Sequence, residues 1–212
     1  MSHYSKEHRK DPSYKKAKKE GYRARSAYKL IDIQKRYNIF KRAFYILDLG
    51  SAPGSWLQVA KKFAEENLEK YNDSYYHRDH YKILGVDKKS ISPLENVKIL
   101  KMDFTSKEFK NVVMEYFGYN KLDLILSDAS INKSGNKFSD QARQITLCHK
   151  ILDLTRFLKE EGVFVIKLFQ GADFNNFYKI LKSKFSVVKN YKPASSSKKS
   201  NEIYVICFKK KN

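Results

Sequence analysis

The sequence contains little cysteine and no long apolar run. Cys148 and Cys207 are the only cysteines among 212 residues. They lie far apart without the spacing of a metal site, which favours a reducing compartment. No apolar stretch is long enough to cross a bilayer, so we expect no membrane partner. The opening residues MSHYSKEHRK lack an apolar segment, and we expect no secretory signal.

Acidic residues are scarce at both ends of the chain. Residues 1–42 hold 14 Lys and Arg against 4 Asp and Glu, and residues 179–212 hold 10 Lys against one acid, Glu202. The middle is nearly neutral, although the whole chain carries a net charge of +20. Because Lys and Arg neutralise phosphates and release counterions, RNA or DNA is the expected partner. Composition alone leaves open a merely solubilising surface.

The order of apolar patterns predicts one α/β domain. Apolar residues make up 42% of the chain, enough for a core. Buried strands alternate with amphipathic helices, which predicts a mostly parallel, seven-stranded sheet with helices on both faces. The last two strands follow each other without a helix, so we expect them to be antiparallel. Strands are expected at 44–49, 82–87, 97–102, 122–127, 162–169, 185–191 and 202–208, and helices at 12–22, 26–37 (capped by Ser26), 55–65, 106–117, 139–159 and 173–184.

We divide the chain into a basic N-terminal extension, 1–25, and a single domain, 26–212. The stretch 66–81 is polar and aromatic without a steady period, and we predict an insertion loop there. His77 and His80 lie in this stretch without further ligands, so we expect a solvated loop and no metal.

Acids and glycines follow several predicted strands. Asp48 precedes a turn with Gly50 and Gly54, and Asp87, Asp103 and Asp128 end later strands. In open parallel sheets ligands bind beyond the carboxyl ends of the strands, and an acid after the second strand can accept ribose hydroxyls. The turn lacks the G-x-G-x-x-G pattern of a nicotinamide oxidoreductase, and an acid at Asp48 suits a cation, so S-adenosylmethionine fits better than NAD. An ordinary strand–turn–helix connection is the alternative.

Two further charged residues have unusual positions. Lys167 lies within the apolar strand VFVIKLF, and lysine is rarely buried without a partner. Asp128, at the end of a neighbouring strand, could be that partner. Taken singly, Lys167 could extend its amine out of a strand end, Asp128 could cap a turn, and Glu202 could form a weak surface ion pair. Lys29 alone would pass as a solvated helix residue.

Five motifs carry a resemblance to a known family. They are Arg23-Ala-Arg-Ser-Ala-Tyr-Lys-Leu30, Asp48-Leu-Gly-Ser-Ala-Pro-Gly-Ser-Trp56, Leu126-Ser-Asp-Ala-Ser-Ile-Asn-Lys-Ser-Gly135, Val165-Ile-Lys-Leu-Phe-Gln-Gly171 and Lys192-Pro-Ala-Ser-Ser-Ser…Asn-Glu-Ile-Tyr204. In this order they resemble the RrmJ/FtsJ family of ribose 2′-O-methyltransferases over nearly the whole chain.

The resemblance implies a Rossmann-like methyltransferase that uses S-adenosylmethionine. The family's Lys-Asp-Lys-Glu tetrad falls on Lys29, Asp128, Lys167 and Glu202. Lys167 would be the general base or would steer the nucleophile, Asp128 would orient Lys167, and Lys29 and Glu202 would hold the ribose. The implied cofactor contacts are Asp48, Gly50, Ala52, Pro53, Gly54, Trp56, Asp87, Asp103, Phe104 and Asp128. For Trp56, packing in the core is the alternative.

The implied substrate is RNA, because DNA lacks the 2′-hydroxyl. We favour ribosomal RNA of the large subunit, with a uridine as the expected target, and keep transfer RNA or a non-catalytic RNA-binding module as alternatives. The candidate RNA contacts are Arg23, Arg25, Lys192, Lys198 and Lys199. We expect a monomer, and leave open whether the protein acts in the mitochondrion or in the cytoplasm or nucleolus.

The sequence departs from the family pattern in three places. Ile131 replaces the proline of Asp-Met-Ala-Pro-Asn, which predicts a less rigid loop. Ser55-Trp56 replaces Gly-Trp, a change that also occurs in relatives acting on transfer RNA. The 66–81 stretch and the opening Asp11-Pro-Ser-Tyr resemble mitochondrial relatives, whereas Asn132 and Ser134-Gly135 favour the large-subunit branch.

Overall fold

The sheet has its strands in the order β3-β2-β1-β4-β5-β7-β6. The structure, a computed structural model, describes residues 12–71, 79–119, 121–132, 134–196 and 200–211. The strands are β1 (Tyr45–Leu49), β2 (Lys82–Asp87), β3 (Lys98–Lys101), β4 (Leu122–Ser127), β5 (Leu158–Phe169), β6 (Phe185–Tyr191) and β7 (Glu202–Lys210). Pairs among β1 to β5 are parallel, and β7 is antiparallel to both β5 and β6. The predicted mostly parallel sheet with an antiparallel final strand is confirmed.

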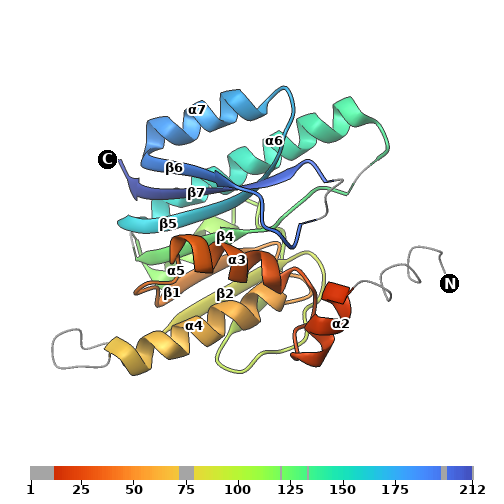
Figure 1. Cartoon of the computed structure of the whole chain (residues 1–212). Coiled ribbons are helices and arrows are strands. Elements are labelled where there is room, and N and C mark those ends of the chain that lie inside the picture. Colours follow the sequence, from red (N-terminus) through yellow and green to blue (C-terminus); the bar gives the residue numbers. More distant parts are fainter. Residues whose placement is uncertain (1–11, 72–78, 120, 133, 197–199, 212) are drawn as a thin grey trace.

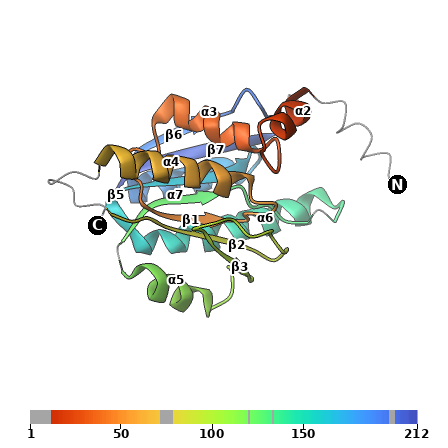
Figure 2. The ribbon, with the colours of Figure 1, turned by 90° about the horizontal axis from the view of Figure 1, so that it is seen from below.

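Helices cover both faces of this sheet (Figures 1 and 2). They are α2 (Pro12–Lys19), α3 (Ala27–Tyr37), α4 (Ser55–Tyr71), α5 (Phe109–Phe117), α6 (Lys137–Asp153) and α7 (Phe174–Lys184), with the short 3₁₀ helix η1 (Leu154–Phe157) before β5. Buried residues of α3 and α4 pack on one face, and buried residues of α5, α6 and α7 pack on the other. Since strand residues alternate between faces, each face has its own core.

Alternation along the central strands decides which side chains meet beyond the sheet edge. Leu124 and Leu126 of β4 and Val165 of β5 belong to the core under α3 and α4. Asp128 and Lys167 continue the same period-two rows, so they lie on this side of the sheet. In β7, Tyr204 lies opposite Lys167 and Glu202 lies opposite Phe169. The antiparallel direction of β7 brings its first residues to the edge where β4 and β5 end.

Several predicted boundaries are wrong. Helix α4 continues to Tyr71 instead of ending at 65, because Ala64, Asn67 and Tyr71 extend its buried face. The predicted loop 66–81 therefore begins as helix, and its residues 72–78, including His77, lie outside the described residues. The helix predicted over 139–159 ends at Asp153, and β5 begins at Leu158, not 162.

The predicted cap by Ser26 is also wrong. Ser26 has helical backbone angles, and its side chain makes no capping hydrogen bond. Its hydroxyl lies 2.8 Å from the Ser55 hydroxyl instead, and its carbonyl accepts a hydrogen bond from Trp56 Nε1 at 2.9 Å. The start of α3 is thus fixed to the start of α4.

Candidate active site

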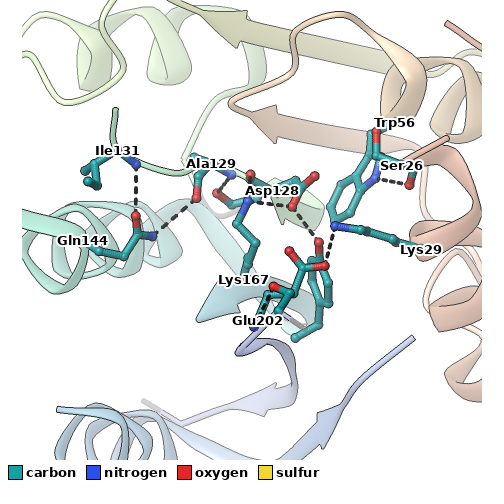
Figure 3. A network of polar contacts seen from close by, with 12 residues as sticks. Ser26, Lys29, Trp56, Asp128, Ala129, Ile131, Gln144, Lys167 and Glu202 are labelled. Carbon is teal, nitrogen blue, oxygen red and sulfur yellow. Dashed lines mark hydrogen bonds and ion pairs between the residues drawn. The ribbon is translucent and has the colours of Figure 1, made fainter. Parts of the chain in front are cut away.

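Lys167 and Asp128 form an ion pair at the ends of β5 and β4 (Figure 3). Lys167 Nζ lies 2.9 Å from Asp128 Oδ1 and also donates to the main-chain oxygen of Asp128. The Lys167 side chain is only 8% exposed. A buried ammonium needs such partners, and this geometry leaves Nζ at the edge of the sheet where a ligand can approach.

Lys29 and Glu202 form a second ion pair beside the first (Figure 3). Lys29 Nζ lies 2.6 Å from Glu202 Oε1, and both side chains are mostly buried. The hydrogen bonds of Ser26 to Ser55 and Trp56 hold the helix that carries Lys29. Asp32 on the same helix accepts hydrogen bonds from Ser195, which precedes β7. The two basic ends of the chain therefore meet at one site, as the sequence predicted.

Tyr204 joins the two ion pairs, and sequence analysis gave it no role. Its hydroxyl donates to Asp128 Oδ1 at 2.6 Å, and Lys29 Nζ lies 5.7 Å from the centre of its ring. Tyr204 has no exposed surface. Burial, together with Asp128, raises the pKa of its hydroxyl well above the usual value, so it remains a donor. Its position two residues after Glu202 on a strand was the available signal, because such residues share a face.

The turn after β1 packs directly against the segment that carries Asp128. Gly50 has φ +76°, and a Cβ there would lie 2.7 Å from Ala129 Cα. Only glycine accepts both this angle and this approach without strain. The Ala52 amide donates to Asp87 Oδ2 at 3.0 Å, which fixes the turn to the end of β2. The turn and the Asp128 segment are therefore one packed unit.

Asp48 lies beneath this unit and is 1% exposed. Its Oδ2 has no hydrogen-bond partner within the described residues. Burial raises the pKa of Asp48 to about 8, and the neighbouring Asp128 contributes. A positively charged ligand group beside Asp48 would favour the ionised form of this carboxyl. The contact between Asp48 and S-adenosylmethionine stays a prediction.

A family model described as FtsJ-like methyltransferase matches residues 22–210. The chain belongs to this family. The Ribosomal RNA large subunit methyltransferase E of Acinetobacter baylyi is 38% identical over 205 residues, which span 96% of this chain and 88% of the relative. The enzyme of the same name from Methanosarcina acetivorans is 38% identical over 199 residues, which span 93% of this chain and 68% of the relative.

Solved structures agree with this membership. A candidate ribosomal RNA methyltransferase from Plasmodium falciparum superposes with a TM-score of 0.72 at 31% identity, covering 90% of this chain and all of that one. A 1,6-didemethyltoxoflavin-N1-methyltransferase from Burkholderia thailandensis has a TM-score of 0.53 at 12% identity and shows the fold alone. This FtsJ-like protein has the Rossmann-like methyltransferase fold, and its cofactor is S-adenosylmethionine.

The other predicted cofactor residues of this FtsJ-like protein lie along the same sheet edge. Although burial opposes it, hydrogen bonds from Lys88 and Thr105 lower the pKa of Asp103 to about 2, which keeps it an acceptor. Phe104 is 8% exposed and packs edge-on against Phe109. Trp56 is buried and packs on Tyr204 at 5.8 Å between ring centres. Core packing of Trp56 is thus observed, and the cofactor contacts of Pro53, Gly54 and the others stay predictions.

Gln144 on α6 is a second residue that sequence analysis missed. Its Oε1 accepts from the Ile131 amide at 3.0 Å, and its Nε2 donates to the Ala129 carbonyl at 3.4 Å (Figure 3). It is 7% exposed. The family has proline at this position, and proline has no backbone N–H to donate. The hydrogen bond from the Ile131 amide that holds the Asp128 segment of this FtsJ-like chain is therefore one that proline cannot make. A glutamine four residues before the buried Cys148 on an amphipathic helix was the signal.

Two of the predicted RNA contacts, Arg23 and Lys192, donate hydrogen bonds to main-chain carbonyls of the protein. The Arg23 guanidinium donates to the carbonyls of Pro53, Ser92 and Pro93, so it ties the cofactor turn to the segment after β2. Lys192 Nζ donates to the Ser200 carbonyl at 2.8 Å. Lys198 and Lys199 lie outside the described residues. RNA binding by these residues and by Arg25 stays a prediction.

No helix in the described ranges is long and apolar enough to cross a membrane. No group of three or more His, Cys, Asp or Glu side chains there could hold a metal ion.

Proposed function

We propose that this FtsJ-like protein methylates a ribose 2′-hydroxyl in large-subunit ribosomal RNA. The observation that supports it most is the assembly of Lys29, Asp128, Lys167 and Glu202, from four separate segments, into two adjacent ion pairs. The names of the relatives from Acinetobacter baylyi and Methanosarcina acetivorans support the substrate class. A uridine is the expected target nucleotide.

Bound S-adenosylmethionine supplies a methyl group that is already activated by its sulfonium, so positioning of the acceptor provides much of the rate. The residues of the turn 50–54, together with Asp48, Asp87 and Asp103, would hold it. Asp48 Oδ2, which has no partner in the described residues, fits its positive charge.

Lys167 would meet the 2′-oxygen of the acceptor. A lysine ammonium has three N–H groups, and Lys167 directs its nitrogen to two oxygens of Asp128. Asp128 therefore fixes the direction in which Lys167 can contact a third group. In the proposed step the 2′-oxygen would bond to the methyl carbon as the bond from that carbon to sulfur breaks. Lys167 would steer the oxygen if it is an ammonium, and would take its proton only as a neutral amine. Lys29 and Glu202 would hold the ribose.

The experiment compares ribosomal RNA from cells with and without the protein by mapping 2′-O-methyl positions. We expect one position to lose its methyl group in the deletion strain. That position should regain the methyl group with the wild-type gene but not with Lys167→Ala. An unchanged map would refute the proposal. A change in transfer RNA only would establish the alternative substrate.

The purified protein should bind S-adenosylmethionine, and should not bind NAD, when each is titrated into it by calorimetry. Binding of S-adenosylmethionine without methyl transfer to any RNA would support the non-catalytic RNA-binding module instead.

A further inference from the structure

A cavity of about 340 Å³ adjoins the tetrad on the other side of β5. It lies between the first half of α6, the end of β5, the start of α7 and the residues before β7. Its volume lies within the range of about 300–1,000 Å³ that is usual for small-ligand sites. Its lining includes Gln141, Phe169, Gln170, Phe174 and Asn201. None of its lining residues belongs to the turn 50–54 or is Asp87 or Asp103, so it is separate from the predicted cofactor contacts.

Phe169 lies next to both this cavity and Lys167. Phe169 lines the cavity, and its ring centre lies 5.9 Å from Lys167 Nζ. Ser200, also in the lining, accepts a hydrogen bond from the Glu202 amide at 3.1 Å. Asn201 directly precedes Glu202. The cavity therefore opens beside the place where the acceptor ribose would lie.

The chemistry of the lining suits an uncharged, planar group. Among the described residues, no Lys or Arg lines the cavity, so none of them offers phosphate a counter-charge there. Two acids line it: Asp140 already accepts hydrogen bonds from Ser134 and Arg143, and Asp173 lies just before α7. Phe169 and Phe174 present aromatic surface, which is what bases stack on in single-stranded RNA recognition.

Four side-chain amides line the cavity, and that of Gln144 is already bonded to Ile131 and Ala129. In the described part of the chain, the side-chain amides of Gln141, Gln170 and Asn201 make no hydrogen bond. Gln141 reaches across to the segment after β5, since a Cβ on Gly171 would lie 2.6 Å from Gln141 Nε2. Each amide offers both a donor and an acceptor. Such groups can read the hydrogen-bonding edge of a base.

We propose that this cavity receives the base of the nucleotide that is methylated. The inference rests on the proposed function. The base is attached to C1′, the ring carbon next to the C2′ that carries the acceptor hydroxyl, so a hydroxyl at Lys167 places the base within reach of Phe169. Phe174 stacks on the base, and Gln141 reads its edge. The target nucleotide is therefore turned out of any helix that contains it.

The test uses large ribosomal subunits from cells that lack the protein. Site-directed changes in the ribosomal RNA gene place each of the four bases, in turn, at the mapped methylation position. Methyl transfer to each subunit is measured with the wild type, with Gln141→Leu and with Phe174→Leu. Asn176→Leu is the matched control, because Asn176 is an exposed amide on α7 outside the cavity. Calorimetry with S-adenosylmethionine and a melting temperature are recorded for every variant.

The wild type should favour one base. Gln141→Leu should lower the ratio of kcat/KM between that base and the others about tenfold, the effect of one lost hydrogen bond. Phe174→Leu should lower kcat/KM about tenfold or more through lost stacking. Cofactor affinity should remain at the wild-type level in every variant. The kcat/KM of Asn176→Leu should equal that of the wild type.

An equal loss on all four bases with Gln141→Leu, or unchanged kinetics in both cavity variants, would overturn the base site while leaving the proposed function intact. Equal wild-type rates on all four bases would also overturn it. If the wild type methylates no subunit while binding S-adenosylmethionine, the proposed function fails, and the base site fails with it.

Discussion

Replacement of Tyr204 by phenylalanine tests how the two ion pairs of the active site are joined. The change removes a single oxygen, whose hydrogen bond to Asp128 Oδ1 measures 2.6 Å. The ring contacts with Trp56 and with the Lys29 ammonium can persist in the variant. The perturbation therefore concerns one hydrogen bond to one carboxylate.

The expected magnitude follows from the charge and the burial of that bond. A hydrogen bond to a charged group contributes about 1.5–3 kcal/mol, and Tyr204 has no exposed surface. We expect the free energy of unfolding to fall by about 1.5–3 kcal/mol. Asp128 keeps its ion pair with Lys167 but loses the hydrogen bond that helps to hold it in place. The single-turnover rate of methyl transfer should therefore fall about tenfold, which corresponds to about 1.4 kcal/mol in the activation barrier.

Urea denaturation and a single-turnover assay at saturating cofactor measure the two effects. Tyr191→Phe is the control, because Tyr191 lies opposite Tyr204 in the sheet and, among the described residues, its hydroxyl makes no hydrogen bond. It should change stability by less than about 0.5 kcal/mol. If Tyr204→Phe is as stable and as active as Tyr191→Phe, the hydroxyl does not hold Asp128 and the reasoning is wrong.

Three further variants test other parts of the site. Lys167→Ala should slow methyl transfer by about 100-fold to 10,000-fold with near-normal cofactor affinity by calorimetry; Lys167→Arg should recover activity only if the residue steers and takes no proton. Burial raises the pKa of Asp48 to about 8, against about 3.9 when unfolded, so the folded state holds a proton that the unfolded chain has released. The stability of the cofactor-free protein should therefore decrease as pH rises from about 4 to about 8; urea titrations in which Asp48→Asn keeps this slope would contradict the assignment. Gln144→Leu leaves the Ala129 carbonyl and the Ile131 amide without their partner, and should cost about 1–3 kcal/mol of stability and reduce kcat; an unaltered denaturation midpoint would show that the segment does not depend on this amide.

Periodicity and strand order made most of the fold predictable. Apolar runs bounded by Asp48, Asp87 and Asp128 indicated buried strands, and their ends defined one edge. The final pair without an intervening helix indicated the antiparallel β7. The tetrad came from the resemblance, since Lys29 alone has no distinguishing neighbourhood in the sequence.

Contacts between distant segments could not be predicted from local pattern. The sequence places Ser26 where a cap is common, but Ser55 and Trp56 of α4, which bind it instead, are known only from the packing. The charge of Arg23 predicted a phosphate contact, yet its guanidinium donates to carbonyls after β1 and β2. In α4, buried Asn67 and Tyr71 continue the helix through a polar stretch.

The reversed direction of β7 has a practical consequence. The strand enters the sheet at the catalytic edge with Glu202 and leaves it at the opposite edge with Lys210 (Figure 1). Residues added after this strand would emerge far from the substrate. A fluorescent reporter or an affinity handle fused there should leave turnover intact, whereas a single residue inserted between Glu202 and Tyr204 should turn that acid to the other face of the sheet, out of reach of Lys29.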